Sequence, residues 1–291
     1  MTDKQKKHPP KIAFIGGDLR QIEAARALRE KGYPVSLYGF DAYNEKDSLP
    51  FADAVKDASV WVLPIPVLRG DTVNLPFSKE KLSVETLVDA LRTYSPAYLF
   101  GGGLPAALLT LGKSKIHDFL SDDGFNTYNA VPTAEGALAL AIGHTDRTLH
   151  SASVAVVGYG KIGRALARSL VALGAEVTVV ARRTEARIEA ELCGCRAIPF
   201  EEAVEAAPKW EVVFNTVPYP VLDGTVLERM RPQVCLIELA SRPYGIVGSE
   251  ALRLGLAVLH APSLPGKTAP RTAGEILARC LTLRLKEEDP T

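Results

Sequence analysis

Residues 153–183 read SVAVVGYGKIGRALARSLVALGAEVTVVARR, and this stretch decides the fold of the part of the chain around it. An apolar strand over Val154 to Val157 runs into Gly158-x-Gly160-x-x-Gly163, and a helical pattern and a second strand over Val177 to Val180 follow. The three glycines permit a tight turn, a close approach of the backbone to a pyrophosphate, and packing of the helix on the strand. Strand, turn, helix and strand within about 30 residues predict a dinucleotide-binding βαβ unit rather than a merely structural glycine turn.

The end of the second strand indicates which dinucleotide binds. The chain has Ala181-Arg182-Arg183-Thr184 where an NAD-binding chain usually places an acidic residue for the ribose 2′-hydroxyl. Two guanidinium groups and a hydroxyl can pair with a 2′-phosphate, which a carboxylate would repel. The sequence therefore favours NADP, with NAD binding more weakly. Two solvated arginines on a loop are the alternative interpretation.

Composition limits which partners and which location can be expected. Lys plus Arg and Asp plus Glu are 34 each, so no overall basic field favours nucleic acid. The first ten residues, MTDKQKKHPP, lack an apolar stretch and are expected to form a flexible tail rather than a secretion signal. With no run of 18 apolar residues, the expected location is the cytoplasm, away from membranes.

The four cysteines, Cys193, Cys195, Cys235 and Cys280, are too few and too scattered for a disulfide framework. Reduced thiols are therefore expected. Cys193-Gly-Cys195 has no second Cys/His pair at zinc-site spacing, so no metal site is predicted.

Alternating strands and helices predict a second α/β half ahead of the glycine turn. An apolar strand leads into Gly16 and Gly17, and further strands are expected over 35–39, 60–63 and 98–100. The fold class is therefore α/β, with two Rossmann-like doubly wound parallel-sheet domains and an interdomain cleft. The expected parts are a flexible tail (1–10), an N-terminal Rossmann-like substrate or partner domain (11–128), an interdomain helix (129–150), an NADP-binding Rossmann domain (151–269) and a C-terminal helix returning to the N-terminal domain (270–291).

Two helices are expected to connect these domains. Pro132 and Thr133 supply a start signal for the first, which would run to about His144. Thr272-Ala-Gly-Glu275 reads as a capping box that begins the second, which would end near Leu285.

Six stretches carry a more specific pattern than the glycines alone. They are IGGDLRQ at 15–21, YGFD at 38–41, NAVPTAEGALALAIGHTD at 129–146, VVGYGKIGRALA at 156–167, LASRPYG at 239–245 and APSLPGKTAPRTAGEILA at 261–278. Together they closely resemble the A subunits of dipicolinate synthase, over nearly the whole chain. The resemblance implies NADP-dependent oxidation of dihydrodipicolinate to dipicolinate, in the mother cell of a sporulating bacterium. It also implies a partner, the flavoprotein-like B subunit of dipicolinate synthase, beside a possible homo-oligomer.

The substrate implied by this resemblance is a ring with two carboxylates, which must be bound and aligned while one proton is accepted. Arg20, beside Asp18 and Gln21, can pair with one carboxylate bidentately, and Arg242 is the candidate for the other. Either arginine could instead be an ordinary surface residue. The predicted substrate-binding residues are Arg20, Gln21, Thr133, Ser241 and Arg242, and the candidate proton acceptors are Asp18 and His260, with water as an alternative.

Cofactor contacts are predicted at the glycine turn, at the end of the second strand, after the strand at 212–215, and at a turn before the last helix. The residues are Gly158, Tyr159, Gly160, Lys161, Ile162, Gly163, Ala181, Arg182, Arg183, Thr184, Asn215, Thr216, Val217, Pro218, Pro265 and Gly266. Two other functions stay open. One is a two-domain NAD(P) dehydrogenase of an amino acid, hydroxy acid or folate, and the other is a non-catalytic nucleotide-binding scaffold for a flavoprotein partner.

Overall fold

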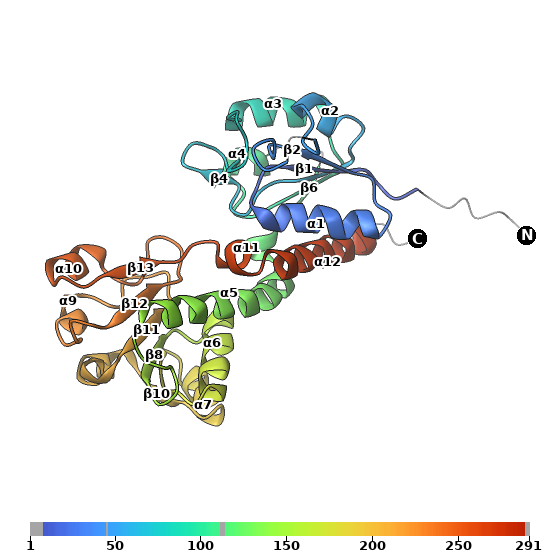
Figure 1. Cartoon of the computed structure of the whole chain (residues 1–291). Coiled ribbons are helices and arrows are strands. Elements are labelled where there is room, and N and C mark those ends of the chain that lie inside the picture. The colour runs from blue at the N-terminus through green and yellow to red at the C-terminus, as the bar shows by residue number, and fades with distance from the viewer. Residues whose placement is uncertain (1–7, 45, 111–113, 289–291) are drawn as a thin grey trace, which may run out of the picture. The chain divides into compact units, whose positions relative to one another are not determined.

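The structure, a computed structural model, describes residues 8–44, 46–110 and 114–288 (Figure 1). Residues 1–7 of the expected tail lie outside this description. The chain divides into two compact units. Unit 1 combines the segment up to Tyr128 with the segment from Ala269 on, and unit 2 is Asn129–Thr268.

Unit 1 contains a parallel sheet with the strand order β2-β1-β3-β6-β7. Its strands are β1 (Ile12–Ile15), β2 (Val35–Tyr38), β3 (Val60–Val62), β6 (Tyr98–Gly101) and β7 (Lys115–Asp118), and β4 (Leu68–Arg69) and β5 (Thr72–Val73) form a separate hairpin. Its helices are α1 (Leu19–Glu30), α2 (Phe51–Val55), α3 (Val84–Tyr94), α4 (Ala106–Leu109), the start of α5 (Asp123–His144), and α12 (Pro270–Glu288).

Both faces of this sheet are covered. In β1, Ile12 and Phe14 belong to one apolar cluster while Ala13 and Ile15 belong to another, because successive side chains of a strand point to opposite faces. The first cluster includes apolar residues of both α1 and α12, so the last helix of the chain completes the core of unit 1. The two helices lie side by side (Figure 1), and a Cβ on Gly274 of α12 would overlap the backbone of α1.

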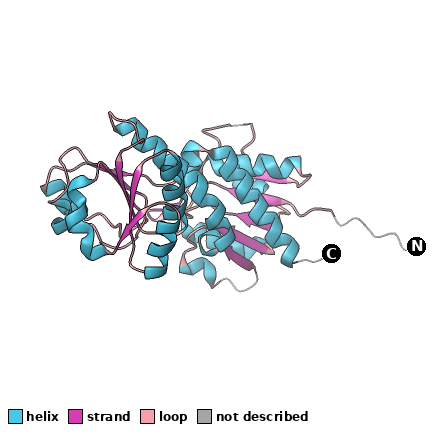
Figure 2. Cartoon of the chain, turned by 90° about the horizontal axis from the view of Figure 1, so that it is seen from below, coloured by secondary structure: helices cyan, strands magenta, loops and turns pink. Residues whose placement is uncertain are grey.

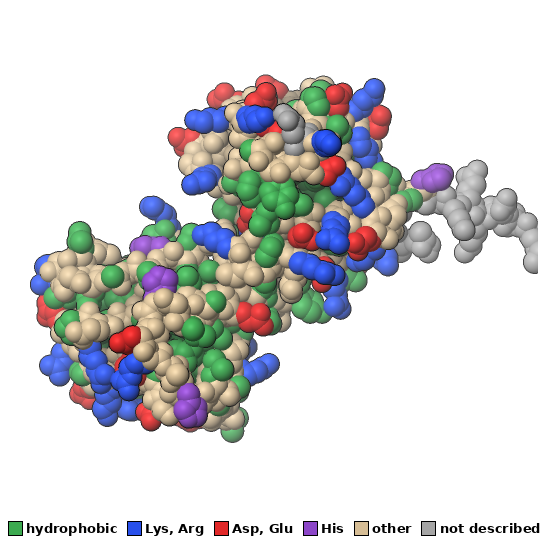
Figure 3. Space-filling model, in the orientation of Figure 1, with side chains coloured by type: hydrophobic (Ala, Val, Ile, Leu, Met, Phe, Trp, Pro, Cys, Tyr) green, Lys and Arg blue, Asp and Glu red, His purple; other side chains and the backbone are tan. Residues whose placement is uncertain are grey.

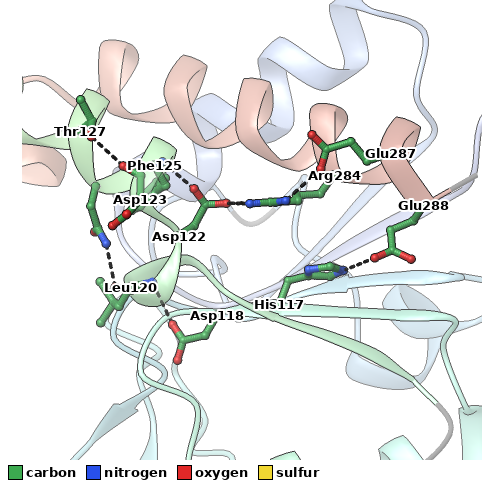
Figure 4. A network of polar contacts seen from close by, with 11 residues as sticks. His117, Asp118, Leu120, Asp122, Asp123, Phe125, Thr127, Arg284, Glu287 and Glu288 are labelled. Carbon is green, nitrogen blue, oxygen red and sulfur yellow. Dashed lines mark hydrogen bonds and ion pairs between the residues drawn. The ribbon is translucent and has the colours of Figure 1, made fainter.

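Polar contacts also hold α12 in unit 1 (Figure 4). The Nε and Nη2 atoms of Arg284 donate to Oδ2 of Asp122, just before α5, at 3.0 and 2.8 Å. Oε1 of Glu288 lies 3.9 Å from Nε2 of His117, which is on β7. The pKa of His117 is lowered, chiefly by burial. Burial alone would raise the pKa of Asp122, but the Phe125 N–H and Arg284 hold it below its ordinary value of 3.8.

Unit 2 contains a six-stranded parallel sheet with the order β10-β9-β8-β11-β12-β13. Its strands are β8 (Ser153–Val157), β9 (Glu176–Val180), β10 (Arg196–Ile198), β11 (Val212–Asn215), β12 (Cys235–Glu238) and β13 (Val258–His260). Its helices are α6 (Lys161–Ala172), α7 (Thr184–Leu192), α8 (Ala203–Ala206), α9 (Gly224–Leu227), α10 (Gly248–Arg253), α11 (Leu264–Thr268) and most of α5. Helices lie on both sides of the strands (Figure 2), and two apolar clusters fill the two faces.

The start of α5 differs from the sequence-based prediction. The helix begins at Asp123, before the expected start at Pro132 and Thr133, because Asp122 caps it by accepting from the Phe125 N–H at 2.9 Å. Pro132 lies inside the helix, where it has no N–H to donate to the fourth carbonyl before it. The prediction was wrong because proline is more common in the first helical turn than in a helix interior.

The surface agrees with the balanced composition. On the face drawn in Figure 3, basic and acidic side chains are interspersed in both units. Within the described ranges, none of the helices combines the length and the apolar composition that a membrane span requires.

Candidate functional site

The carboxyl ends of five unit 2 strands form one row. Each of these strands ends at a residue that lies opposite the last residue of the neighbouring strand. In the order β9, β8, β11, β12 and β13, these residues are Val180, Val157, Asn215, Glu238 and His260. The predicted cofactor loops at 158–163 and 181–184 each follow a member of this row, and the loop at 215–218 begins with one. Parallel topology therefore brings them to one edge of the sheet, where doubly wound folds bind ligands.

The glycine turn has the geometry that a dinucleotide needs. Gly158 has φ +94° and donates its N–H to the Val180 carbonyl at 2.8 Å. A Cβ on Gly163 would overlap the Gly158 carbonyl oxygen, whereas a Cβ on Gly160 would meet no atom within 4 Å and would fill open space. Gly160 is also the N-cap of α6, whose first N–H groups have no partner within the helix. The turn thus fits a pyrophosphate at a helix N-terminus.

The side chains within the turn face two ways. Tyr159 is buried in the core, and its pKa is raised by burial and by a hydrogen bond with Cys193. The Arg164 guanidinium lies 5.6 Å from the centre of the Tyr159 ring. Ile162 also packs against the core, while Lys161 is exposed. Tyr159 and Ile162 can therefore meet a nucleotide mainly through their backbone.

The loop after β9 carries positive charge. Ala181 is buried, whereas Arg182, Arg183 and Thr184 are exposed. Arg187, which the sequence analysis missed, donates to the Ala181 and Arg182 carbonyls at 2.9 and 2.8 Å and to the Thr184 hydroxyl at 3.1 Å. The loop is thus held by one arginine while two others remain exposed. The signal that could have identified Arg187 was its position in the first turn of α7, directly after this loop.

The loop after β11 is tied to the glycine turn. The Thr216 hydroxyl donates to the Val157 carbonyl at 2.9 Å, and a Cβ on Gly158 would overlap that hydroxyl oxygen. Asn215 bonds Val217 twice, through Nδ2 to its carbonyl at 3.0 Å and through Oδ1 from its N–H at 3.2 Å. Pro218, which follows, is exposed.

Glu238 is a buried acid that the sequence analysis did not single out. Only 1% of it is exposed, and its two carboxylate oxygens accept four hydrogen bonds. The donors are Asn215 Nδ2 at 2.7 Å and the N–H groups of Ala240, Gly245 and Ile246, each at 2.9 Å. An acidic residue between an apolar strand and the SRPYG loop was the signal that could have identified it.

Three side chains lie close together at this loop. The Arg242 guanidinium lies 5.5 Å from the centre of the Tyr244 ring, and that ring lies 4.8 Å from the His260 ring. Arg242, Ser241 and His260 are exposed. Arg242, a predicted substrate contact, and His260, a predicted proton acceptor, thus both lie close to the Tyr244 ring.

In unit 1, Asp18 and Arg20 are paired with each other. Asp18 is the N-cap of α1, and it accepts from Nε and Nη2 of Arg20 at 2.9 and 2.8 Å. Nη2 also donates to the Ile65 carbonyl at 2.7 Å, and Arg20 is buried. The expected bidentate contact of Arg20 with a substrate carboxylate is not available through this edge, because Asp18 occupies it. Both oxygens of Asp18 are likewise engaged.

Gln21 lies beside this pair. It is fully buried, and neither its Nε2 nor its Oε1 has a hydrogen-bond partner within the described part of the chain. A Cβ on Gly17 would overlap the Gln21 side chain, so the amide lies directly against the glycine turn that follows β1. A buried amide without partners calls for an explanation, such as a bound polar group or an ordered water.

The remaining predicted residues lie in helices. Thr133 is buried in α5 and donates its hydroxyl to the Asn129 carbonyl at 2.7 Å. Pro265 and Gly266 are buried in α11 and not in the open turn that the sequence suggested. A Cβ on Gly136 of α5 would press against Leu264 and Thr268, so α11 packs closely on α5.

Comparison with known proteins gives consistent matches. Residues 11–115 match the family of N-terminal domains of dipicolinate synthase A subunits, and residues 153–241 match the family described as NADP oxidoreductase, coenzyme F420-dependent. The dipicolinate synthase A subunit of Bacillus subtilis (strain 168) is 37% identical over 95% of this chain and 96% of its own length.

Solved structures of the same family also match this chain over nearly its whole length. The crystal structure of the dipicolinate synthase A subunit from Bacillus halodurans is 32% identical, with a TM-score of 0.84 over 95% of this chain and 97% of that one. The corresponding protein from Bacillus subtilis is 35% identical, with a TM-score of 0.83 over 97% of both chains. A transhydrogenase from Sinorhizobium meliloti, 18% identical with a TM-score of 0.67 over 95% of this chain and 94% of its own, shares the fold. The predicted α/β Rossmann-like fold class and the family resemblance are confirmed, and a nicotinamide cofactor is supported.

Proposed function

Because the chain belongs to the family of dipicolinate synthase A subunits, we propose that it catalyses the NADP-dependent oxidation of dihydrodipicolinate to dipicolinate. The observation that carries the proposal is 37% identity to the Bacillus subtilis protein over 95% of the chain, which includes residues of both units. By the same relationship, we propose that it acts with a flavoprotein-like B subunit in the mother-cell cytoplasm of a sporulating bacterium.

NADP is the proposed cofactor because of the loop after β9. Position 181 is a buried alanine, so no carboxylate there repels a 2′-phosphate, and Arg182 and Arg183 are exposed within the same loop. Arg187 supports these two by holding the carbonyls of the loop. When bound, NADP would supply the hydride acceptor, and the glycine turn would hold its pyrophosphate.

The chain itself must bind a dianion, orient the ring and take up a proton. Loss of one hydride and one proton converts the dihydropyridine ring to an aromatic pyridine, so the step is favourable once the ring is aligned. Arg242 is the proposed partner of one carboxylate, with Ser241 as a neighbouring donor. In unit 1, Arg20 and Gln21 remain candidate substrate contacts, Arg20 through the Nη1 group that does not bond Asp18.

His260 is the better proposed proton acceptor of the two. Its ring is exposed and lies beside Tyr244, next to the Arg242 loop. Asp18 accepts hydrogen bonds with both oxygens and would have to leave Arg20 to act. Water remains an alternative, because aromatisation acidifies the departing C–H.

An assay separates this function from its rivals. Purified chain, NADP and freshly generated dihydrodipicolinate are mixed, and reduced cofactor is followed by its absorbance. We expect reduction with dihydrodipicolinate and none with hydroxy acids, amino acids or methylene-folate. A reaction with one of those substrates instead would favour another dehydrogenase, and activity that appears only when the flavoprotein-like partner is added would favour the scaffold.

A further inference from the structure

Glu238 joins two loops that the proposed reaction uses in different ways. The loop at 215–218 is a proposed cofactor contact, and the loop at 239–245 carries Ser241 and Arg242. They are separate in the sequence, but β11 and β12 pair in register so that Asn215 lies opposite Glu238. One buried carboxylate therefore lies between the cofactor loop and the substrate loop.

The two oxygens of this carboxylate accept from different parts of the protein. Oε1 accepts from Asn215 Nδ2 at 2.7 Å and from the Ala240 N–H at 2.9 Å, so a single oxygen bonds both loops. Oε2 accepts from the N–H groups of Gly245 and Ile246, each at 2.9 Å. The loop residues that carry Ser241 and Arg242 are thus held at both ends by the same side chain. A carboxylate can fill these roles because both of its oxygens only accept hydrogen bonds.

The loop between these two anchors is closely constrained. Tyr244 has φ +70°, a left-handed conformation that non-glycine residues rarely adopt and that persists only when the surroundings fix it. Gly245 packs so tightly that a Cβ there would overlap Asn215 Nδ2, and its carbonyl accepts from the N–H groups of Val221 and Leu222. The conformation that presents Arg242 therefore depends on contacts at Gly245, and Glu238 supplies one of them by accepting from the Gly245 N–H.

We propose that Glu238 is a positioning residue, which fixes the Arg242 loop relative to the Asn215 loop and so sets the alignment of substrate with nicotinamide. This inference rests on the proposed function. It assigns Glu238 no contact with substrate or cofactor, since its side chain is buried and its oxygens are engaged by the protein. The loops at 158–163 and 181–184 have no bond to Glu238, so binding of the pyrophosphate and the 2′-phosphate should not depend on it.

The test compares Glu238→Gln with Glu238→Asp and with Glu228→Gln. The glutamine variant places an N–H₂ group where an oxygen accepted, and the aspartate variant keeps the charge but shortens the reach. Glu228 is the matched control, because it pairs with Arg253 on the surface of the same unit and touches neither loop. Each full-length variant is assayed for thermal unfolding, NADP affinity, kcat, KM, and the deuterium isotope effect on kcat with ring-deuterated substrate.

For Glu238→Gln we expect kcat/KM to fall about 100-fold, as a misalignment of about 1 Å can cause. We also expect a larger isotope effect and an NADP dissociation constant within about threefold of the unsubstituted protein. Glu238→Asp should recover part of the activity, and Glu228→Gln should match the unsubstituted protein. A merely structural role would lower the amount of folded enzyme and leave KM and the isotope effect unchanged.

The inference is overturned if Glu238→Gln matches Glu228→Gln in kcat/KM, or if its loss is accompanied by an equal loss of NADP affinity. Should Glu238→Gln fail to fold, Glu238→Asp decides, since unchanged KM and isotope effect in that variant would equally overturn it. Failure of the proposed function is recognised separately, because the unsubstituted protein would then not reduce NADP with dihydrodipicolinate.

Discussion

Cofactor selectivity should depend on the two exposed arginines after β9. Arg182 and Arg183 are exposed, and the position before them is a buried alanine. No acidic residue within 181–184 therefore repels a 2′-phosphate. Charge-assisted hydrogen bonds contribute about 1.5–3 kcal/mol when shielded and exposed ion pairs about 0.2–1 kcal/mol. For exposed arginines facing a multiply charged phosphate we take about 1 kcal/mol each, so replacing both should weaken NADP about 30-fold.

Titration calorimetry with both cofactors measures this effect. Arg182→Ala combined with Arg183→Ala should raise the NADP dissociation constant about 30-fold and change that of NAD less than about threefold, because NAD has no 2′-phosphate. Arg229→Ala is the matched control, since Arg229 is exposed and precedes β12, at the amino ends of the strands. Equal losses for NADP and NAD would refute the assignment of this loop.

Three further results are expected. Arg242→Ala should weaken dipicolinate binding by about 1 kcal/mol, because one carboxylate loses an exposed cation, while NADP binding measured alongside stays unchanged. Asp122→Asn should cost about 0.5–1 kcal/mol near neutral pH. Because the pKa of Asp122 is lowered in the fold, this stability is present above its ordinary value of 3.8 and is lost as the pH falls through the lowered pKa, so unfolding curves of the two proteins should converge in acid. Iodoacetamide should label native protein at the exposed Cys193, while Cys195 and Cys280, whose pKa values burial raises to about 11, should react only after unfolding.

The sequence predicted the central strands of both sheets and missed one edge strand of each, β7 and β10. Central parallel strands are buried on both faces and appear as apolar runs, as at Val154 to Val157. Strand β7, Lys-Ile-His-Asp, is mostly polar, and β10, Arg-Ala-Ile, has only three residues, so periodicity marks neither. The start of α5 was placed late because its cap, Asp122, lies before a segment with few apolar residues.

Residues of the candidate site were predictable where one motif contains them. The glycine turn and the Arg182–Arg183 loop follow from local spacing. The Asn215–Glu238 bond does not, because it joins residues 23 positions apart through the register of two strands. The pairing of Asp18 with Arg20 was also missed. Their spacing fits a helix cap as well as a ligand site, and only the side-chain geometry shows that the acid occupies the bidentate edge of the arginine.

Tracing the hydride tests the central claim most directly, namely that this chain itself oxidises dihydrodipicolinate with NADP. Dihydrodipicolinate deuterated at its saturated ring carbons is mixed with purified chain and NADP, and both products are analysed by mass spectrometry. The account predicts dipicolinate and reduced cofactor in equal amounts, with one deuterium on each reduced nicotinamide. Dipicolinate that forms without labelled NADPH, at the rate seen in the absence of the chain, would contradict it.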